Sequence, residues 1–272
     1  CLYAGGIVDA NSRKYPVTTG AFQTTYGGGG IGAPPVQLPC DISISKYSPD
    51  GSKLLFATYM GGFDDEYPHS LCVDPFNNLL VFGTTLSPDF PVHPDSAYSN
   101  THEGDYDIFV NKLNNSGTQL LGGTFIGGSD ADGFQTEIPT TLLVYNYADN
   151  YRGDITTDND GNIFVATCTR SNDFPTTPGA LQAKPKGETD AAIICLNNSL
   201  STIKWATLLG GDQDDAAYSI KVDDTAHLFV GGGTMISNNF PIAGNGYRKS
   251  AIGDIYGFIT RFNKNNGFYQ VG

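Results

Sequence analysis

The phrase DFPTTPGALQ (residues 173–182) recurs three more times in recognisable form. The other copies are YPVTTGAFQ (15–23), DFPVHPDSAYS (89–99) and NFPIAGNGY (239–247). A catalytic motif is normally written once in a chain, whereas a structural unit that must be built several times is written several times. The recurrence therefore predicts a repeated architecture, and no other feature of the sequence restricts the fold as strongly.

Each copy lies among short runs that are typical of β-strands. In the second copy these runs are 69–74, 79–85, 107–114 and 120–128. They are rich in β-branched and aromatic residues and are bounded by turn sequences such as SPDGS, NNSGT and NKNNG. No segment keeps a 3.6-residue apolar period. Because glycine is abundant (34 of 272 residues) and charged residues make up only 16%, the composition also favours short strands and many turns. The sequence predicts an all-β chain.

Four antiparallel strands per repeat, at this repeat length, are typical of β-propeller blades. The repeats span about 1–62, 63–128, 129–211 and 212–272, which we interpret as one propeller region. The first copy lacks its first strand and the last ends in a degraded fourth strand. Two interpretations follow: a small closed propeller, or part of a larger one, and we favour the second. Within a blade, the second strand is expected deep between sheets, and the Phe of the phrase is expected to fill the gap between them.

The combined pattern resembles the SBBP repeat, the seven-bladed β-propeller repeat. The resemblance rests on GNIFVATCTRSNDFPTTPGALQ, DAAIICLN and the recurring double glycines, and it is clearest between Asp160 and Gly211. It implies a bacterial secreted or cell-surface protein, and hence an extracellular or surface location at the outer membrane. It also implies a type IX secretion substrate or a protein associated with gliding motility or adhesion.

Charge and cysteine content restrict the partners and the redox chemistry. The formal net charge of −13 disfavours nucleic acid and anionic lipid surfaces, and no run of 18 apolar residues is present to insert into a membrane. Three of the five cysteines (Cys72, Cys168 and Cys195) lie in apolar strand-like runs, where free cysteine behaves as a small hydrophobe. We expect unpaired core cysteines, with a Cys1–Cys40 disulfide as the main exception.

Two connections are longer than their counterparts in the other copies. From the double glycine to the first-strand aspartate the distance is 30 residues in the third copy (Gly128 to Asp158) but 12 in its neighbours. The connection from Gln23 to Asp41 is likewise longer than the one from Gln182 to Asp190. Because strands alternate in direction, we place both insertions on one face of the blades. The longer one carries the candidate binding residues Leu142, Leu143, Tyr145, Tyr147 and Tyr151. The alternative is that these side chains plug the blade edge.

Motifs for catalysis and cofactors are weak. GGGGIG (27–32) is followed by consecutive prolines that forbid the helix a dinucleotide site needs. DNDGN (158–162), GGFDDE and GGDQDD leave calcium open, but each occupies a place where a turn needs a cap. No H-E-x-x-H or G-x-S-x-G is present. We expect no catalytic residues, no metal ligands and no cofactor.

We therefore interpret the chain as a non-catalytic binding or structural module that acts in adhesion, surface assembly or as secretion-system cargo. Its expected partner is a protein or glycan at the bacterial surface, or a larger envelope or secretion complex. The alternative is a carbohydrate-active propeller enzyme or a lectin-like domain with its site at the central opening. An enzyme needs carboxylates that converge within a few ångströms, whereas a scaffold would carry its acids singly with the symmetry of the blades.

Overall fold

The computed structural model describes residues 1–9, 15–28, 39–93, 95–134, 152–235, 239–242 and 255–271. These residues form fifteen β-strands and no helix. With no helix in the described ranges, none there is long and apolar enough to cross a membrane. The prediction of an all-β chain is confirmed.

The strands pair into four antiparallel sheets, each following chain order. Sheet 1 consists of β1 (Leu2–Asp9), β2 (Cys40–Tyr47) and β3 (Leu54–Met60). Sheet 2 consists of β4 (Glu66–Val73), β5 (Leu79–Thr85), β6 (Asp107–Leu113) and β7 (Leu120–Ile126). Sheet 3 consists of β8 (Asp154–Thr157), β9 (Ile163–Thr169), β10 (Asp190–Leu196) and β11 (Ile203–Leu209). Sheet 4 consists of β12 (Asp215–Val222), β13 (His227–Met235), β14 (Ile255–Asn263) and β15 (Tyr269–Val271).

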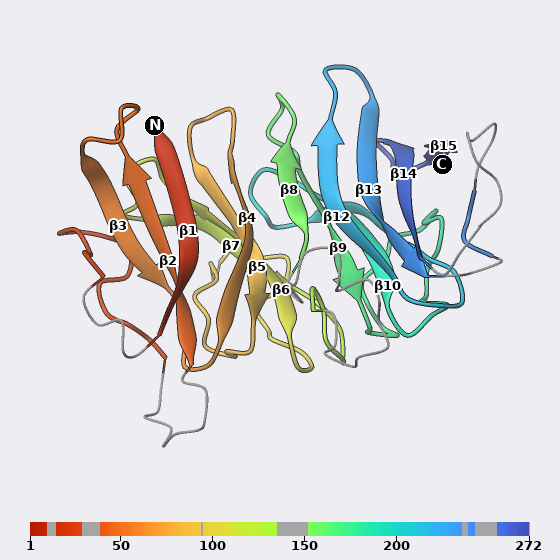
Figure 1. Ribbon diagram of the computed structural model, residues 1–272, viewed down its shortest axis with the longest axis horizontal. Coiled ribbons are helices and arrows are strands. Elements are labelled where there is room, and N and C mark those ends of the chain that lie inside the picture. Colours follow the sequence, from red (N-terminus) through yellow and green to blue (C-terminus); the bar gives the residue numbers. More distant parts are fainter. Residues whose placement is uncertain are drawn as a thin grey trace.

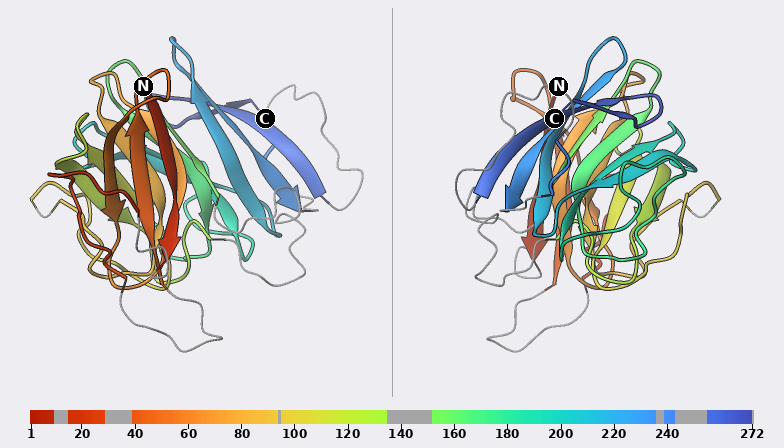
Figure 2. Two further views of the ribbon diagram at one scale, coloured as in Figure 1. Left: turned by 60° about the vertical axis from the view of Figure 1, so that its left-hand side comes forward. Right: turned by 90° about the vertical axis from the view of Figure 1, so that its right-hand side faces the viewer.

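The four sheets stand side by side in chain order (Figure 1). The first strands of sheets 2, 3 and 4 form the inner row, since β8 lies against both β4 and β12. Figure 2 shows the array from two further directions. This arrangement is compatible with a propeller, but the array is open, with the N-terminus and the C-terminus at opposite ends of it in Figure 1.

Apolar side chains between neighbouring sheets hold the array together. The second strands β5 and β9 are buried along their whole length, as expected, and so are the third strands β6 and β10. Phe90 and Phe174, from two copies of the repeated phrase, are 3% and 4% exposed. Phe90 packs in the core between sheets 1 and 2, 4.3 Å from the ring centre of Phe109, and Phe174 packs in the core between sheets 2 and 3. These rings fill the gaps between sheets, as the sequence predicts.

Sheet 4 exposes a face that its neighbour buries. Phe164 and Ile193 of sheet 3 are fully buried in the core shared with sheet 4. Their counterparts one repeat later are Phe229 and Ile259, which are 40% and 77% exposed. The outer face of sheet 4 is therefore built like a face that packs against another sheet.

The described residues on either side of the longer insertion both pair with β9. Glu66 pairs with Thr85 and Asp215 pairs with Thr234 at the beginning of the first strands β4 and β12. Asp132 makes the same bridge to Thr169, so the first strand of sheet 3 has already begun there. Asp132, which the sequence predicts in the connection before the first strand, therefore belongs to the first-strand position, as Asp154 does. In β4 and β12 the position that corresponds to the insertion is a register shift, a place where a sheet accommodates extra residues.

The Cys1–Cys40 disulfide is absent, because all five cysteines are free. The register of β1 and β2 gives the reason. Asp9 pairs with Cys40 and Leu2 pairs with Tyr47, so Cys1 and Cys40 stand at opposite ends of an eight-residue strand. Such a strand is about 25 Å long, whereas a disulfide needs Cα atoms within about 7 Å.

Candidate functional site

Buried carboxyl groups stand in pairs where one sheet meets the next. Each pair combines an acid at the beginning of the third strand of one repeat with an acid at the beginning of the first strand of the next repeat. In the three-stranded sheet 1, β2 corresponds to the third strand of a repeat, and in sheet 3 the first strand begins at the bridge from Asp132 to Thr169. We name the pairs junction one (Asp41 and Glu66), junction two (Asp107 and Asp132) and junction three (Asp190 and Asp215). All six side chains are at most 1% exposed. They lie at the end of the array where second strands connect to third strands and fourth strands connect to first strands (Figure 1).

The first glycine of each double glycine separates the two acids. A Cβ added to Gly127 would lie 2.1 Å from Asp107 Oδ1 and 2.9 Å from Asp132 Oδ2. At Gly210 the corresponding distances to Asp190 Oδ1 and Asp215 Oδ2 are 2.2 and 2.8 Å. Only glycine allows this approach. Gly61 stands between Asp41 and Glu66 in the same way.

The second glycine and nearby hydroxyl groups hold the first-strand acid. The Gly128 amide donates to Asp132 Oδ2 at 2.8 Å, and the hydroxyls of Thr169 and Ser171 donate to the two oxygens of that carboxyl. At junction one, Gly62 and Thr85 donate to Glu66 at 2.9 and 2.7 Å. Gly211 donates to Asp215 at 2.6 Å. The three junctions are therefore copies of one arrangement.

Burial raises the pKa of these acids, and for Glu66, Asp107 and Asp215 the charge of the other acid in the pair raises it further. The pKa is about 8 for Glu66, about 8 for Asp107, about 7 for Asp132 and about 7 for Asp215. Burial also raises the pKa of Asp41 to about 6, against amide hydrogen bonds from Gly27 and Gly28 that lower it. The pairs therefore keep protons near neutral pH, since two adjacent carboxylates in a buried place cannot both ionise at low cost.

A glutamine from the repeated phrase closes two of the junctions. At junction three, Gln182 Oε1 accepts from the Gly210 amide at 3.1 Å, while its Nε2 donates to Lys184 O at 2.9 Å and to Asp190 Oδ2. At junction one, Gln23 Oε1 accepts from Gly61 at 3.1 Å and Nε2 donates to Thr25 O at 3.0 Å. Both glycines are buried.

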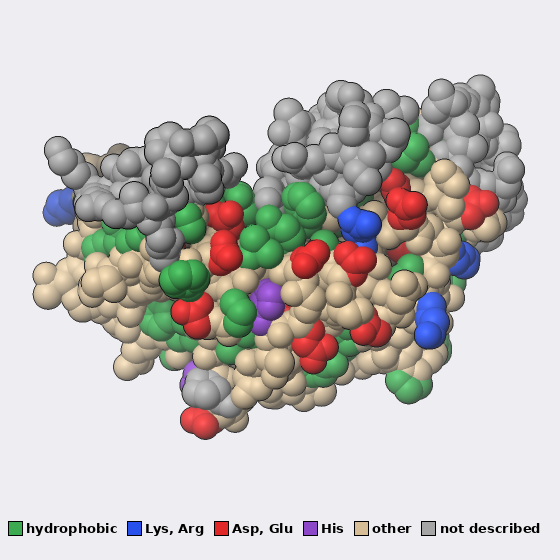
Figure 3. Space-filling view, turned by 90° about the horizontal axis from the view of Figure 1, so that it is seen from below, with side chains coloured by type: hydrophobic (Ala, Val, Ile, Leu, Met, Phe, Trp, Pro, Cys, Tyr) green, Lys and Arg blue, Asp and Glu red, His purple; other side chains and the backbone are tan. Residues whose placement is uncertain are grey.

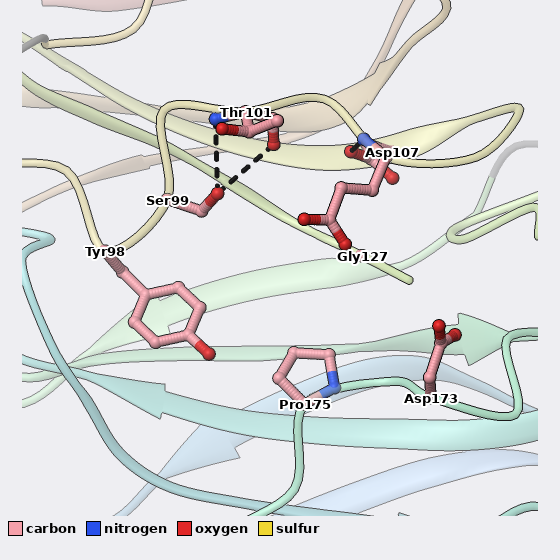
Figure 4. A pocket seen from close by; sticks show the side chains of 8 residues that line it. Tyr98, Ser99, Thr101, Asp107, Gly127, Asp173 and Pro175 are labelled. Atoms are coloured by element: carbon pink, nitrogen blue, oxygen red, sulfur yellow. Dashed lines mark hydrogen bonds between the residues drawn. The ribbon is translucent and has the colours of Figure 1, made fainter. Parts of the chain in front are cut away.

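Junction two has Ser99 in the place of this glutamine. The backbone position is the same, because the amides of Gln23, Ser99 and Gln182 donate to Thr58, Thr124 and Thr207 at 2.9, 3.0 and 3.2 Å. The Ser99 hydroxyl bonds to the backbone of Thr101 instead of reaching the glycine, as Figure 4 shows. Gly127 is accordingly half-buried, unlike Gly61 and Gly210.

A cavity of about 360 Å³ opens at junction two. Its walls come from two copies of the repeated phrase, one in sheet 2 and one in sheet 3, and from the ends of β6 and β7. Tyr98 and Pro175 supply apolar surface (Figure 4). The other lining residues are Ser99, Thr101, Glu103, Asp107, Gly127 and Asp173. Seen from below, this face of the molecule carries scattered acidic side chains (Figure 3).

Two of the lining carboxyl groups differ in their hydrogen bonds among the described residues. Asp107 Oδ1 is buried and makes no hydrogen bond, whereas Oδ2 accepts from the Glu103 amide at 2.7 Å. Asp173 is exposed, and its Oδ1 accepts from the amide and the hydroxyl of Ser129 at 2.8 and 3.0 Å. These hydrogen bonds lower the pKa of Asp173. The cavity is therefore acidic and offers both hydrogen-bond donors and acceptors.

A carboxylate on the inner row of strands links neighbouring sheets. Asp154 on β8 accepts from Ser70 on β4 at 2.9 Å and from the Ile220 amide and Lys221 Nζ on β12 at 3.1 and 3.0 Å. This single carboxylate ties three neighbouring first strands together. No group of three or more residues that could hold a metal ion was found in the part of the chain that the structure describes.

Several sequence-predicted sites have a structural role or cannot be placed. Leu142, Leu143, Tyr145, Tyr147 and Tyr151 lie outside the described residues. Asp158 in DNDGN accepts from the amides of Asp160 and Asn162 at 3.1 and 2.8 Å, which makes it the cap of a hairpin turn. Asp74 and Asp223 cap the equivalent turns.

Sequence reasoning did not select Ser99. The signal was present, since alignment of GAFQ, SAYS and GALQ shows one copy without the glutamine. The missing glutamine indicates an open junction only when its hydrogen bond to a glycine of the same junction is known. That glycine is 38 residues away in the sequence at junction one and 28 residues away at junction three. Comparison with known proteins found no matching family model and no curated protein that matches the chain.

Proposed function

We propose that this chain is a non-catalytic, propeller-like module that binds a ligand at one specialised junction between its sheets. The observation that supports this most is the repetition of the carboxyl pairs. Three pairs recur with the same glycine and hydroxyl partners, which is the behaviour of a scaffold, and a cavity has been found at the one junction that lacks the glutamine.

The outer face of sheet 4 supports the propeller part of this proposal. Phe229 and Ile259 repeat the positions of Phe164 and Ile193, which pack against the next sheet. A further sheet of the same type fits this face, and stacking of such sheets around an axis is how propeller blades bury both their faces.

The resemblance to the SBBP repeat supports the biological setting. We propose a secreted or bacterial cell-surface protein that acts in adhesion, in surface assembly or as secretion-system cargo, with a protein or glycan as its partner. Export by type IX secretion and a link to gliding motility are the finer parts of this proposal, and they rest on the resemblance alone. We propose no cofactor.

The alternative, a carbohydrate-active enzyme, has one specific observation in its favour. Two carboxyl groups with raised pKa meet beside the junction-two cavity, and glycoside hydrolysis uses a carboxyl pair. The same pair occurs at junctions one and three, where glutamine covers it, and a catalytic pair has no need of such copies. The binding module is therefore the better explanation.

A hydrolysis assay separates the two functions. Purified protein is incubated with a panel of aryl glycosides at about pH 5 to 8, beside the Asp132→Asn variant, with folding of both checked by circular dichroism. The module predicts no turnover by either protein. Turnover by the native chain that is lost in a folded Asp132→Asn variant would establish the enzyme instead.

A further inference from the structure

The closed junctions show which chemical group fits the open one. At junctions one and three, the group against the glycine amide is a primary carboxamide, whose oxygen accepts from the glycine and whose nitrogen donates to a backbone carbonyl. At junction three the nitrogen also donates to the third-strand aspartate. These contacts define a small polar site with one donor and two acceptors.

Junction two retains the frame of that site. Eight residues separate Ser99 from Asp107, as eight separate Gln182 from Asp190. The Glu103 amide donates to Asp107 Oδ2 at 2.7 Å, and the Lys186 amide donates to Asp190 Oδ2 at 2.8 Å. The Thr101 carbonyl corresponds to that of Lys184, because Ser99 Oγ and Gln182 Nε2 donate to them at 3.2 and 2.9 Å. The loop therefore has the same course in both sheets, and the side chains differ.

We propose that the junction-two cavity binds a primary carboxamide carried by a neutral or cationic ligand, with the Gly127 amide as donor and Asp107 and the Thr101 carbonyl as acceptors. The inference rests on the proposed function, since it names the ligand class of the binding module. At junction three the carboxamide nitrogen donates to Asp190 Oδ2, the same oxygen that accepts from the Lys186 amide, so the corresponding acceptor at junction two is Asp107 Oδ2.

The rest of the cavity restricts what the carboxamide is attached to. Tyr98 and Pro175 provide apolar surface for a short alkyl chain (Figure 4). Glu103, Asp107 and Asp173 disfavour an anionic ligand. Two sources have this chemistry: a small free amide, or the glutamine side chain of a protein segment.

The test follows the ¹H–¹⁵N resonance of Gly127 during titration with propionamide, which reproduces a glutamine side chain from Cβ onward. We expect a saturating shift with a dissociation constant on the order of millimolar. Propionate, which has the same shape without the N–H donors, should bind at least about tenfold more weakly. Peptides Lys-Gln-Lys and Lys-Glu-Lys form the second arm. Binding of the glutamine peptide at least about tenfold tighter than propionamide would identify a protein segment as the source, and equal binding would identify a small amide.

Two exchanges of side chains between the junctions provide the controls. Ser99→Gln should close the cavity from within, abolish the response of Gly127 to propionamide and raise the melting temperature. Gln182→Ser should open junction three and make Gly210 respond. If Gln182→Ser does not fold, Ser99→Gln still decides the question.

The outcomes separate this inference from the proposed function. No shift at Gly127 up to about 0.1 M propionamide, or an equal shift in Ser99→Gln, would overturn the carboxamide site. Neither result bears on the non-catalytic module, which fails only if the hydrolysis assay finds turnover.

Discussion

Replacing Asp107 by asparagine should make the stability of the protein less sensitive to pH. The pKa of Asp107 rises from an ordinary value of 3.8 to about 8 in the fold because the carboxyl is buried beside Asp132. Between about pH 6 and 7.5 the unfolded chain has lost this proton while the folded chain still largely holds it. The unfolded state thus binds fewer protons, and the free energy of unfolding falls as the pH rises, by about 1.4 kcal/mol per pH unit. Over this window the loss from Asp107 is about 2 kcal/mol.

Asparagine removes this loss without changing the size of the side chain. Its carbonyl oxygen still accepts from Glu103, and its amide lies beside Asp132 in place of an acidic oxygen. Urea unfolding, followed by fluorescence of the sole tryptophan, the buried Trp205, measures the free energy of unfolding at both pH values. We expect the decrease between them to be about 2 kcal/mol smaller in Asp107→Asn than in the native protein.

Asp50→Asn is the matched control, because hydrogen bonds from Ser48 and Ser52 lower the pKa of Asp50 to about 2, far below the window. His69, whose pKa burial lowers to about 3, contributes equally to all three proteins and cancels. Equal decreases in Asp107→Asn and the native protein would refute the claim that the pair holds a proton.

Three further substitutions or reactions test other parts of the structure. Gly210→Ala should lower the free energy of unfolding in urea by about 2–4 kcal/mol, because its Cβ would lie 2.2 Å from Asp190 Oδ1. Gly231→Ala, whose Cβ would have its nearest neighbour at 3.9 Å, should lower it by less than about 1 kcal/mol. Equal losses would contradict the close approach at the junction. Asp154→Ala should lower the free energy of unfolding by about 1–3 kcal/mol, because it leaves the Ser70 hydroxyl and the Ile220 amide without their acceptor. Lys221→Met removes only a largely exposed ion pair and should lower it by less than about 1 kcal/mol. The reverse order would argue against Asp154 as the link between first strands. Ellman's reagent at about pH 8 should find one fast-reacting thiol, that of the exposed Cys1. Burial raises the pKa of Cys40 and Cys195 to about 12, so these thiols should react slowly. Rapid reaction of either buried thiol would contradict their placement.

Local patterns in the sequence were enough to predict the strands and their order. Runs such as 66–73 and 79–85 carry their own strand signal, and the turn capped by Asp74 lies between these two, so a meander of antiparallel strands follows directly. The role of Phe90 and Phe174 followed from their recurrence. Contacts between residues that are far apart in the sequence were harder to predict. The sequence predicts Asp132 in the connection before the first strand of sheet 3, because its bridge to Thr169 has no local signal.

The candidate site was harder to predict for the same reason. Asp41 and Glu66 are 25 residues apart, and only the stacking of two sheets brings them to either side of Gly61. The recurring acids are predicted as turn caps, and this is confirmed for Asp158 and for Glu66, which accepts from the Gly62 amide; the pairing of Glu66 with Asp41 has no signal in the sequence. The binding prediction for Leu142 and its neighbours stays untested, since they lie outside the described residues.

A crystal structure of the Ser99→Gln variant would show whether the three junctions are copies of one arrangement and whether the second is open because of a single side chain. We expect the introduced carboxamide to accept from the Gly127 amide, to donate to the Thr101 carbonyl and to fill the polar end of the cavity, with the hydrogen bonds that Gln182 makes at junction three. An introduced side chain that points into solvent, with the cavity unchanged, would contradict the equivalence of the junctions and the binding site inferred from it.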